Sequence, residues 1–166
     1  FDGRMNFKEI QDNWANVNQR IANRSSWDYY GLGADLHTVQ DFYAHSNYVE
    51  LYIQYYQDQG GDMAEFSEDN IPLYDEGIND ENFRTNYLEK NLRTGDFDLV
   101  KNEKNPAYNK EKLKDNTHYR INKDSNESPH GGEKVKGTNK TYHDVAKSVA
   151  TRASKKVLEQ KLETND

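Results

Sequence analysis

Hydrophobic residues recur at helical spacing near both ends of the chain. In residues 8–24 they are spaced by four, three and four positions, and a similar stripe follows Thr141, a residue suited to cap a helix. These patterns predict two amphipathic helices that each bury one face in a core. The apolar positions are Ile10, Trp14, Val17 and Ile21 in the first segment, and Val145, Val149, Ala153 and Val157 in the second.

A third helix is predicted in the first half of the chain. It begins near Trp27 or Tyr30, after the capping residues at 25–28, and runs to about Gln57. The glycine pair at 60–61 is expected to end it.

The rest of the chain is more polar. Residues 62–79 are expected to form a loop, and Asp80 then caps a further helix that Gly95 closes. The segment from 96 to about 140 is rich in Asn, Lys, Asp and Gly, which predicts a long irregular excursion. We therefore expect one mainly α domain over residues 1–166, with four or five helices.

Composition supports a folded domain with a small core. Leu, Ile, Val and Phe supply 30 of 166 residues, a low share, but twelve Tyr and two Trp add large side chains that can be buried. The chain has no Cys, so any metal site must use His and carboxylate ligands. No apolar run approaches the length of a membrane-spanning helix.

Charge and the chain start bear on partners. The net charge of −7 is spread along the sequence, which argues against a surface dedicated to nucleic acid. The chain opens on Phe1 without an initiator Met, and we interpret it as a domain cut from a longer protein.

The candidate chemistry lies in the helix predicted around residues 32–48. His37, Asp41 and His45 are spaced four and four, so they fall within about 80° of one another on a helix. The rest of that helix is largely apolar, which predicts burial in the core. Buried polar groups must be paired or must bind a metal.

Zinc suits this donor set, because it binds His nitrogen and Asp oxygen. His37 and Asp41 can reach one ion, whereas His45 lies about 12 Å from His37 along the helix axis and would serve a second ion. Asp41 could then bridge the two. The alternative is a polar stripe without metal, in which the histidines bond to loop carbonyls.

Three segments resemble a known family. LHTVQDFYAHSNYVEL at 36–51, RINKDSNESPHGG at 120–132 and YHDVAKSVATRA at 142–153 resemble the HET-C family and, more broadly, the zinc-dependent phospholipase C and single-strand nuclease superfamily. The resemblance implies an all-α fold of the phospholipase C type around a central metal-binding helix. The opening FDGRMNF is similar to the start of certain bacterial Rhs-type toxin domains.

The resemblance implies a ligand set on this chain. His37, Asp41 and His45 match the family's His, bridging Asp and following His, although His45 comes four residues after the Asp where the phospholipases have six. Asp41 is then both a ligand and a catalytic residue. Asp2 matches an Asp that orients or deprotonates the attacking water.

Further ligands are expected from outside the central helix. His130 falls in the second similar segment, and His143 lies in the late helix, where the phospholipases have His-x-x-x-Glu. Here the Glu position holds Lys147, so a ligand is missing. One to three zinc ions are expected. The residues that could complete a second site are His130, His118, Asp144 and Glu50.

These features together predict a zinc-dependent phosphodiester hydrolase of the phospholipase C type, acting on phospholipid at a membrane surface. The Rhs-like opening implies a toxin domain, secreted or delivered outside the producing cell within a larger protein, with an immunity protein as partner. Tyrosines near the central helix are expected mostly in the core, with one or two at a substrate cleft.

Two alternatives use the same ligands. One is a zinc-dependent single-strand nuclease, which would want basic residues and stacking aromatic rings around its cleft. The other is a non-catalytic, metal-stabilised module for interaction or cell death, in which Lys147 reflects lost catalysis.

Overall fold

The structure is a computed structural model that describes residues 1, 3–95 and 117–163 of the chain. The described residues are mainly helical and contain no strand, so the predicted fold class is confirmed. The longer helices are α1 (Phe7–Asn23), α2 (Tyr29–His45), α3 (Tyr48–Asp58) and α9 (Tyr142–Glu163). The short ones are η1 (Glu68–Asn70), α4 (Tyr74–Gly77), α5 (Glu81–Phe83), the π-helical turn η2 (Arg84–Leu88), α6 (Glu89–Asn91) and α8 (His118–Ile121).

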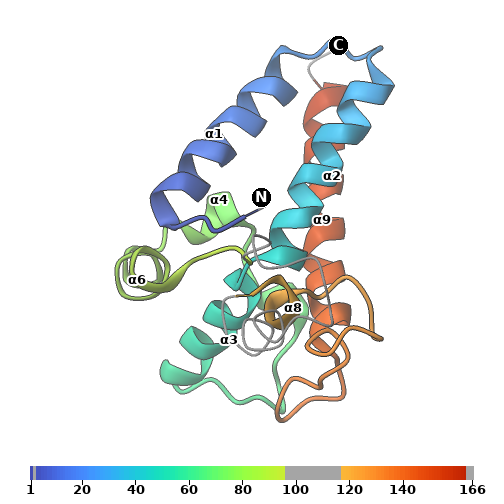
Figure 1. The fold of residues 1–166 in the computed structure, drawn as a ribbon. Coiled ribbons are helices and arrows are strands. Elements are labelled where there is room, and N and C mark those ends of the chain that lie inside the picture. The colour runs from blue at the N-terminus through green and yellow to red at the C-terminus, as the bar shows by residue number, and fades with distance from the viewer. Residues whose placement is uncertain (2, 96–116, 164–166) are drawn as a thin grey trace, which may run out of the picture.

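Three of the long helices form an arm that projects from the rest of the molecule. Figure 1 shows α1, α2 and α9 running along one another, with the α1–α2 turn and the last turns of α9 at the outer end. The shorter elements gather around α3 and α8 at the other end. The arm therefore places the predicted metal helix, α2, directly against α9.

Helix α1 forms as the sequence predicts. Asn6 and Glu9 cap it reciprocally, because the Asn6 side chain accepts from Glu9 N while Glu9 accepts from Asn6 N. The predicted apolar positions are all buried. A buried ion pair then joins α1 to α2: Asp35, only 2% exposed, accepts hydrogen bonds from Arg20 and Arg24.

The prediction of one helix from about residue 30 to Gln57 is wrong, because the chain breaks at Ser46 and Asn47. Ser46 is extended and forms an isolated bridge with Thr94, and its carbonyl accepts from Lys123 Nζ at 2.7 Å. Asn47 exchanges hydrogen bonds with Arg93. Residues far away in the sequence thus make hydrogen bonds with the backbone at the break. Because these backbone groups have partners outside the helix, the helix can end here.

The remaining predictions hold in part. Asp80 caps the next helix at Phe83 N as expected, but a π-helical turn interrupts that helix and it ends at Asn91. Residues 62–79 contain two short helices as well as loop. The expected excursion lies partly outside the described residues, at 96–116; its described part, 117–140, is irregular apart from α8.

The last helix, α9, begins where predicted. Thr141 Oγ1 accepts from Asp144 N at 3.1 Å, which caps the helix, and Val145, Val149 and Ala153 are buried. Gln40 of α2 donates to Ser154 of α9 at 2.9 Å.

Aromatic rings fill much of the core, as the composition predicts. Trp14 stacks on Tyr74 with ring centroids 5.2 Å apart, and Phe1 and Phe42 pack against the same indole. Tyr43 and Tyr48 are fully buried. These rings compensate for the small number of aliphatic residues.

Candidate functional site

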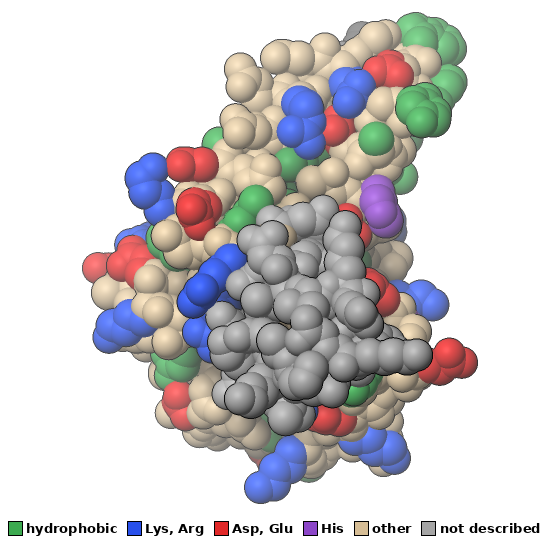
Figure 2. All heavy atoms as spheres, viewed as in Figure 1, with side chains coloured by type: hydrophobic (Ala, Val, Ile, Leu, Met, Phe, Trp, Pro, Cys, Tyr) green, Lys and Arg blue, Asp and Glu red, His purple; other side chains and the backbone are tan. Residues whose placement is uncertain are grey.

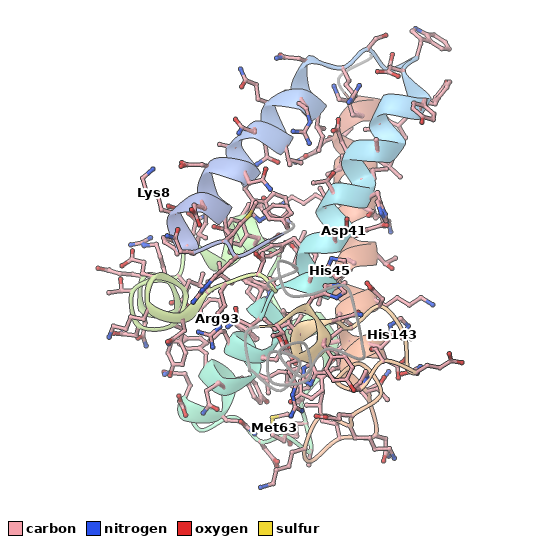
Figure 3. The ribbon with its side chains drawn as sticks, in the orientation of Figure 1. Lys8, Asp41, His45, Met63, Arg93 and His143 are labelled. Atoms are coloured by element: carbon pink, nitrogen blue, oxygen red, sulfur yellow. The ribbon has the colours of Figure 1, made fainter. Side chains whose placement is uncertain are left out.

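A cleft of about 310 Å³ opens between α2, α9 and the loop that follows α8. Figure 3 shows Asp41 and His45 on successive turns of α2, with His143 on the neighbouring α9. The cleft therefore brings together three of the candidate residues that the sequence singles out, His37, Asp41 and His143. Its lining residues are His37, Gln40, Asp41, Ala44, Lys123, Asp124, His143, Ala146, Lys147, Ala150 and Thr151.

The loop is fixed to the end of α2 by its backbone and by a buried lysine. Lys123 N donates to the carbonyl of Ala44 at 3.0 Å, and Lys123 Nζ, on a side chain with no exposed surface, donates to the Ser46 and Ile121 carbonyls. This docking places the next residue, Asp124, beside His45.

His37 and Asp41 both line the cleft, one turn apart. Nε2 of His37 lies 3.6 Å from Oδ1 of Asp41, and the two side chains are 75% and 25% exposed. Two residues of the predicted stripe thus border the cleft, but His37 is not buried as the apolar pattern of the helix predicts. The reason is that α9 covers only part of this face, which leaves the side chain of His37 open to solvent.

His45 belongs to a different group of ligands. Nε2 of His45 lies 2.8 Å from Oδ1 of Asp124, and its ring lies 4.8 Å from the ring of His118. The hydrogen bond from His45 lowers the pKa of Asp124 despite the opposing effect of burial. Within the described ranges, these three residues form the one group of three or more His, Asp or Glu whose ligand atoms all lie within 4.8 Å of one another.

His143 lines the cleft from α9, and one of its ring nitrogens makes a hydrogen bond to the backbone. Its Nδ1 lies 2.7 Å from the carbonyl oxygen of Lys123. A carbonyl can only accept, so Nδ1 carries a proton, and in the neutral ring the lone pair is then on Nε2. Metal-binding histidines are commonly oriented by such a bond from the second nitrogen. Lys147 follows one turn later and also lines the cleft.

His130 does not line the cleft. Its Nε2 bonds to Oε1 of Glu50 at 2.8 Å, the same oxygen that Lys123 Nζ reaches at 2.9 Å, and its ring stacks on Tyr142. Burial would raise the pKa of Glu50, but the charge of Lys123 and the bond to His130 together lower it. The expected ligand His130 and the alternative Glu50 therefore lie in one buried ion-pair network.

Among the remaining candidate residues that the structure describes, Asp144 lies away from the cleft. Asp144 is exposed and caps α9 through Thr141. Asp2 lies outside the described residues. The tyrosines expected near the metal helix also do not reach the cleft: within the described part of the chain, no Tyr, Trp or Phe lines it.

Asp124 is the residue that sequence reasoning missed. It lies in the second segment that resembles the HET-C family, so the resemblance already marked its surroundings. Its pairing with His45 depends on the docking of the loop on α2, which no local pattern reveals. The group of two imidazoles and one carboxylate fits zinc, which favours nitrogen and carboxylate ligands and commonly takes three from the protein in catalytic sites.

Comparison of the chain with protein-family models, with curated proteins and with solved structures finds no match. The resemblance to the HET-C family therefore stays a prediction. Among the described helices, none combines the length and the apolar character needed to cross a membrane.

Proposed function

We propose that this domain is a zinc-dependent phosphodiester hydrolase of the phospholipase C type. The observation that carries the proposal is the convergence of two histidines, two carboxylates and an exposed lysine on one cleft. These are His37, Asp41, Asp124, His143 and Lys147, contributed by α2, α9 and the loop between them. Hydrolysis of a phosphodiester needs metal ligands, a proton carrier and a cation for the phosphate in one place, and the cleft offers all three.

The residues suited to hold zinc form two adjacent sets. The first set is His45, His118 and Asp124, whose ligand atoms all lie within 4.8 Å of one another. His37, Asp41 and His143 border the adjoining cleft and could hold a further ion. Bound zinc would supply a water of lowered pKa and would neutralise charge on the phosphoryl oxygens.

The remaining roles follow from the side chains themselves. Lys147 is exposed on the cleft wall and would bind a phosphoryl oxygen. His143 presents Nε2 with a free lone pair, so it can hold a ligand or accept a proton at that atom. Asp124, whose Oδ1 lies 2.8 Å from His45 Nε2, would be the carboxylate ligand beside that imidazole.

Phospholipid is the substrate class that we propose. A single-strand nuclease stacks bases on aromatic rings beside a basic groove. The described lining of this cleft has no aromatic ring apart from its histidines, and the chain carries a net charge of −7. A small zwitterionic head group needs neither stacking aromatic rings nor a basic groove. By resemblance to Rhs-type toxins, we also propose delivery outside the producing cell and an immunity protein as partner.

The test measures the zinc content of the protein and asks which of three substrates it hydrolyses. Untagged protein is analysed for zinc and then incubated with phosphatidylcholine vesicles, single-stranded DNA and single-stranded RNA, with and without a chelator. We expect bound zinc and chelator-sensitive release of diacylglycerol. Release of nucleotides with intact lipid would support the nuclease instead, and bound zinc without any hydrolysis would support a non-catalytic module.

A further inference from the structure

The large hydrophobic side chains that are exposed in the described structure all lie near one end of the molecule. Trp27 is 80% exposed, Tyr29 69% and Tyr30 93%, and we call these three residues the aromatic tip. Leu158 and Leu162, in the last turns of α9, are exposed too. Figure 2 shows apolar side chains gathered at the outer end of the arm.

The turn that carries the tip is held rigidly. Asp28 caps α2 by accepting from Gly31 N at 2.9 Å, and it also pairs with Arg24 at 2.6 Å. A Cβ at position 31 would meet the guanidinium of Arg24 and the carboxylate of Asp28, so this ion pair lies directly against the backbone of Gly31. Lys161 ties the end of α9 to the turn by donating to the carbonyls of Ala22 and Arg24. The hydrogen bonds and the ion pair of this turn therefore hold the backbone in a conformation that leaves the aromatic rings exposed.

The two arginines beside the tip are paired with carboxylates. Arg24 pairs with Asp28 and Asp35, and Arg20 pairs with the same buried Asp35. These arginines are thereby matched by carboxylates of the same turn and helices. A surface of this kind has little to gain from an anionic partner and suits a zwitterionic one.

We propose that the aromatic tip is a membrane-docking surface that enters the interfacial layer of a phospholipid bilayer. This proposal rests on the proposed function, because it explains how a phospholipid hydrolase would meet its substrate. Trp and Tyr are the side chains that concentrate at membrane interfaces, where an apolar ring and a polar edge are both solvated. His37, the first cleft residue on α2, follows Tyr30 by seven residues, about 10 Å along the helix.

A protein partner is a poorer fit to the tip. Three aromatic side chains offer about 450–750 Å² even if all are fully buried. A stable protein interface buries about 800 Å² on each side, usually on a broad surface. The tip instead projects from the end of a narrow arm, a shape that suits shallow insertion.

Tryptophan fluorescence tests the docking directly. The chain has two tryptophans, and Trp14 is buried in the core while Trp27 is exposed, so a vesicle-induced change reports on the tip. With phosphatidylcholine vesicles, we expect a blue shift of the emission and quenching by brominated lipid. Raising the salt from about 0.1 to about 0.5 M should leave both nearly unchanged, since Arg24 beside the tip is already paired with Asp28 and Asp35. Unchanged emission at saturating lipid would overturn the proposal.

Variants of the tip supply the second measurement. We expect Trp27→Ser with Tyr30→Ser to lower co-sedimentation with vesicles about tenfold or more, because two rings no longer enter the interface. Tyr30→Phe keeps the ring and should bind as the unaltered protein does. Both side chains are exposed, so thermal unfolding should be unchanged in every variant. Equal co-sedimentation of the double variant and the unaltered protein would contradict the docking role.

A soluble substrate separates this inference from the proposed function. A short-chain phosphatidylcholine below its micelle concentration needs the cleft but no membrane, so the double variant should hydrolyse it at the unaltered rate and lose activity on vesicles only. Vesicle binding through Trp27 without any hydrolysis would support the docking surface and overturn the proposed function. Hydrolysis of the soluble lipid without vesicle binding would support the proposed function and overturn the docking surface. A dimer that depends on Trp27 and ignores vesicles would also overturn the docking surface.

Discussion

Nδ1 of His143 lies 2.7 Å from the carbonyl oxygen of Lys123, whose own Nζ donates to the carbonyl of Ser46. One residue of the loop therefore joins the start of α9 to the break between α2 and α3. Because the carbonyl accepts from Nδ1, the orientation of the His143 ring depends on a loop that is itself fixed by a buried lysine. The geometry of the cleft and the stability of the fold are thus coupled at Lys123.

The first prediction concerns that buried lysine. We expect Lys123→Met to lower the free energy of unfolding by about 3–5 kcal/mol, because two buried carbonyls lose their donor and Glu50 keeps only His130 as a partner. Urea denaturation measures the loss. Lys136→Met, at an exposed lysine, serves as the control and should change stability by about 0.5 kcal/mol or less. A loss below about 1 kcal/mol for Lys123→Met would show that the network contributes little.

The second prediction concerns the His45, His118 and Asp124 group. Asp124→Ala should remove bound zinc and lower the thermal midpoint of the zinc-loaded protein, since metal binding adds to folding free energy. Elemental analysis and thermal scans with and without chelator measure both effects. Glu127→Ala removes an exposed carboxylate from the same loop and should change neither. Asp41→Ala should also lower zinc content if the cleft holds an ion; full retention in both variants would contradict the metal assignment.

The third prediction concerns the ion pair between α1 and α2. Burial would raise the pKa of Asp35, but hydrogen bonds and charges of Arg24 and Arg20 lower it overall. Asp35→Asn should therefore cost about 1–3 kcal/mol at neutral pH, a modest value because Arg20 is half exposed. A depressed pKa stabilises the fold above the ordinary carboxyl pKa of about 3.9, and the benefit disappears as pH falls through the folded value.

Urea denaturation at several pH values checks the sign of this effect. The difference between the unaltered protein and Asp35→Asn should be full at pH 6–7 and should shrink below about pH 4. Asp12→Asn breaks an exposed pair with Lys8 and should cost almost nothing at any pH. A difference that grows on acidification would contradict the assigned direction.

The predictable parts of the fold are those set by local sequence. Helix α1 depends on an apolar stripe and an Asn6 cap, and both are visible in the chain itself. The end of α2 depends instead on Thr94 and Lys123, which lie far away in sequence and satisfy the backbone at Ser46. A periodic pattern continues through the break, so the pattern alone predicts one long helix.

The candidate site also has a part that local sequence predicts and a part that depends on the fold. His37 and Asp41 share the cleft because one helix fixes their spacing, and that spacing is visible in the sequence. The partner of His45 could not be predicted, because Asp124 reaches it only through the fold of an irregular segment. His130 lies in a similar segment and contacts Glu50, so membership of the segment did not fix which residue faces the cleft.

The last prediction concerns Lys147, which stands where the phospholipases that this chain resembles have a carboxylate. Lys147 and His143 lie one turn apart on α9 and both line the cleft, so Lys147→Glu should place a carboxylate beside the lone pair of His143. We expect this variant to bind one additional zinc ion, with a rise in thermal midpoint of about 5–10 °C at zinc well above its dissociation constant. Titration calorimetry and elemental analysis count the ions. Lys155→Glu makes the same charge change on the exposed face of α9 and should leave the count unaltered. An unchanged zinc count in Lys147→Glu would mean that His143 does not direct Nε2 toward a metal, and the cleft would then be limited to the ligands of α2 and the loop.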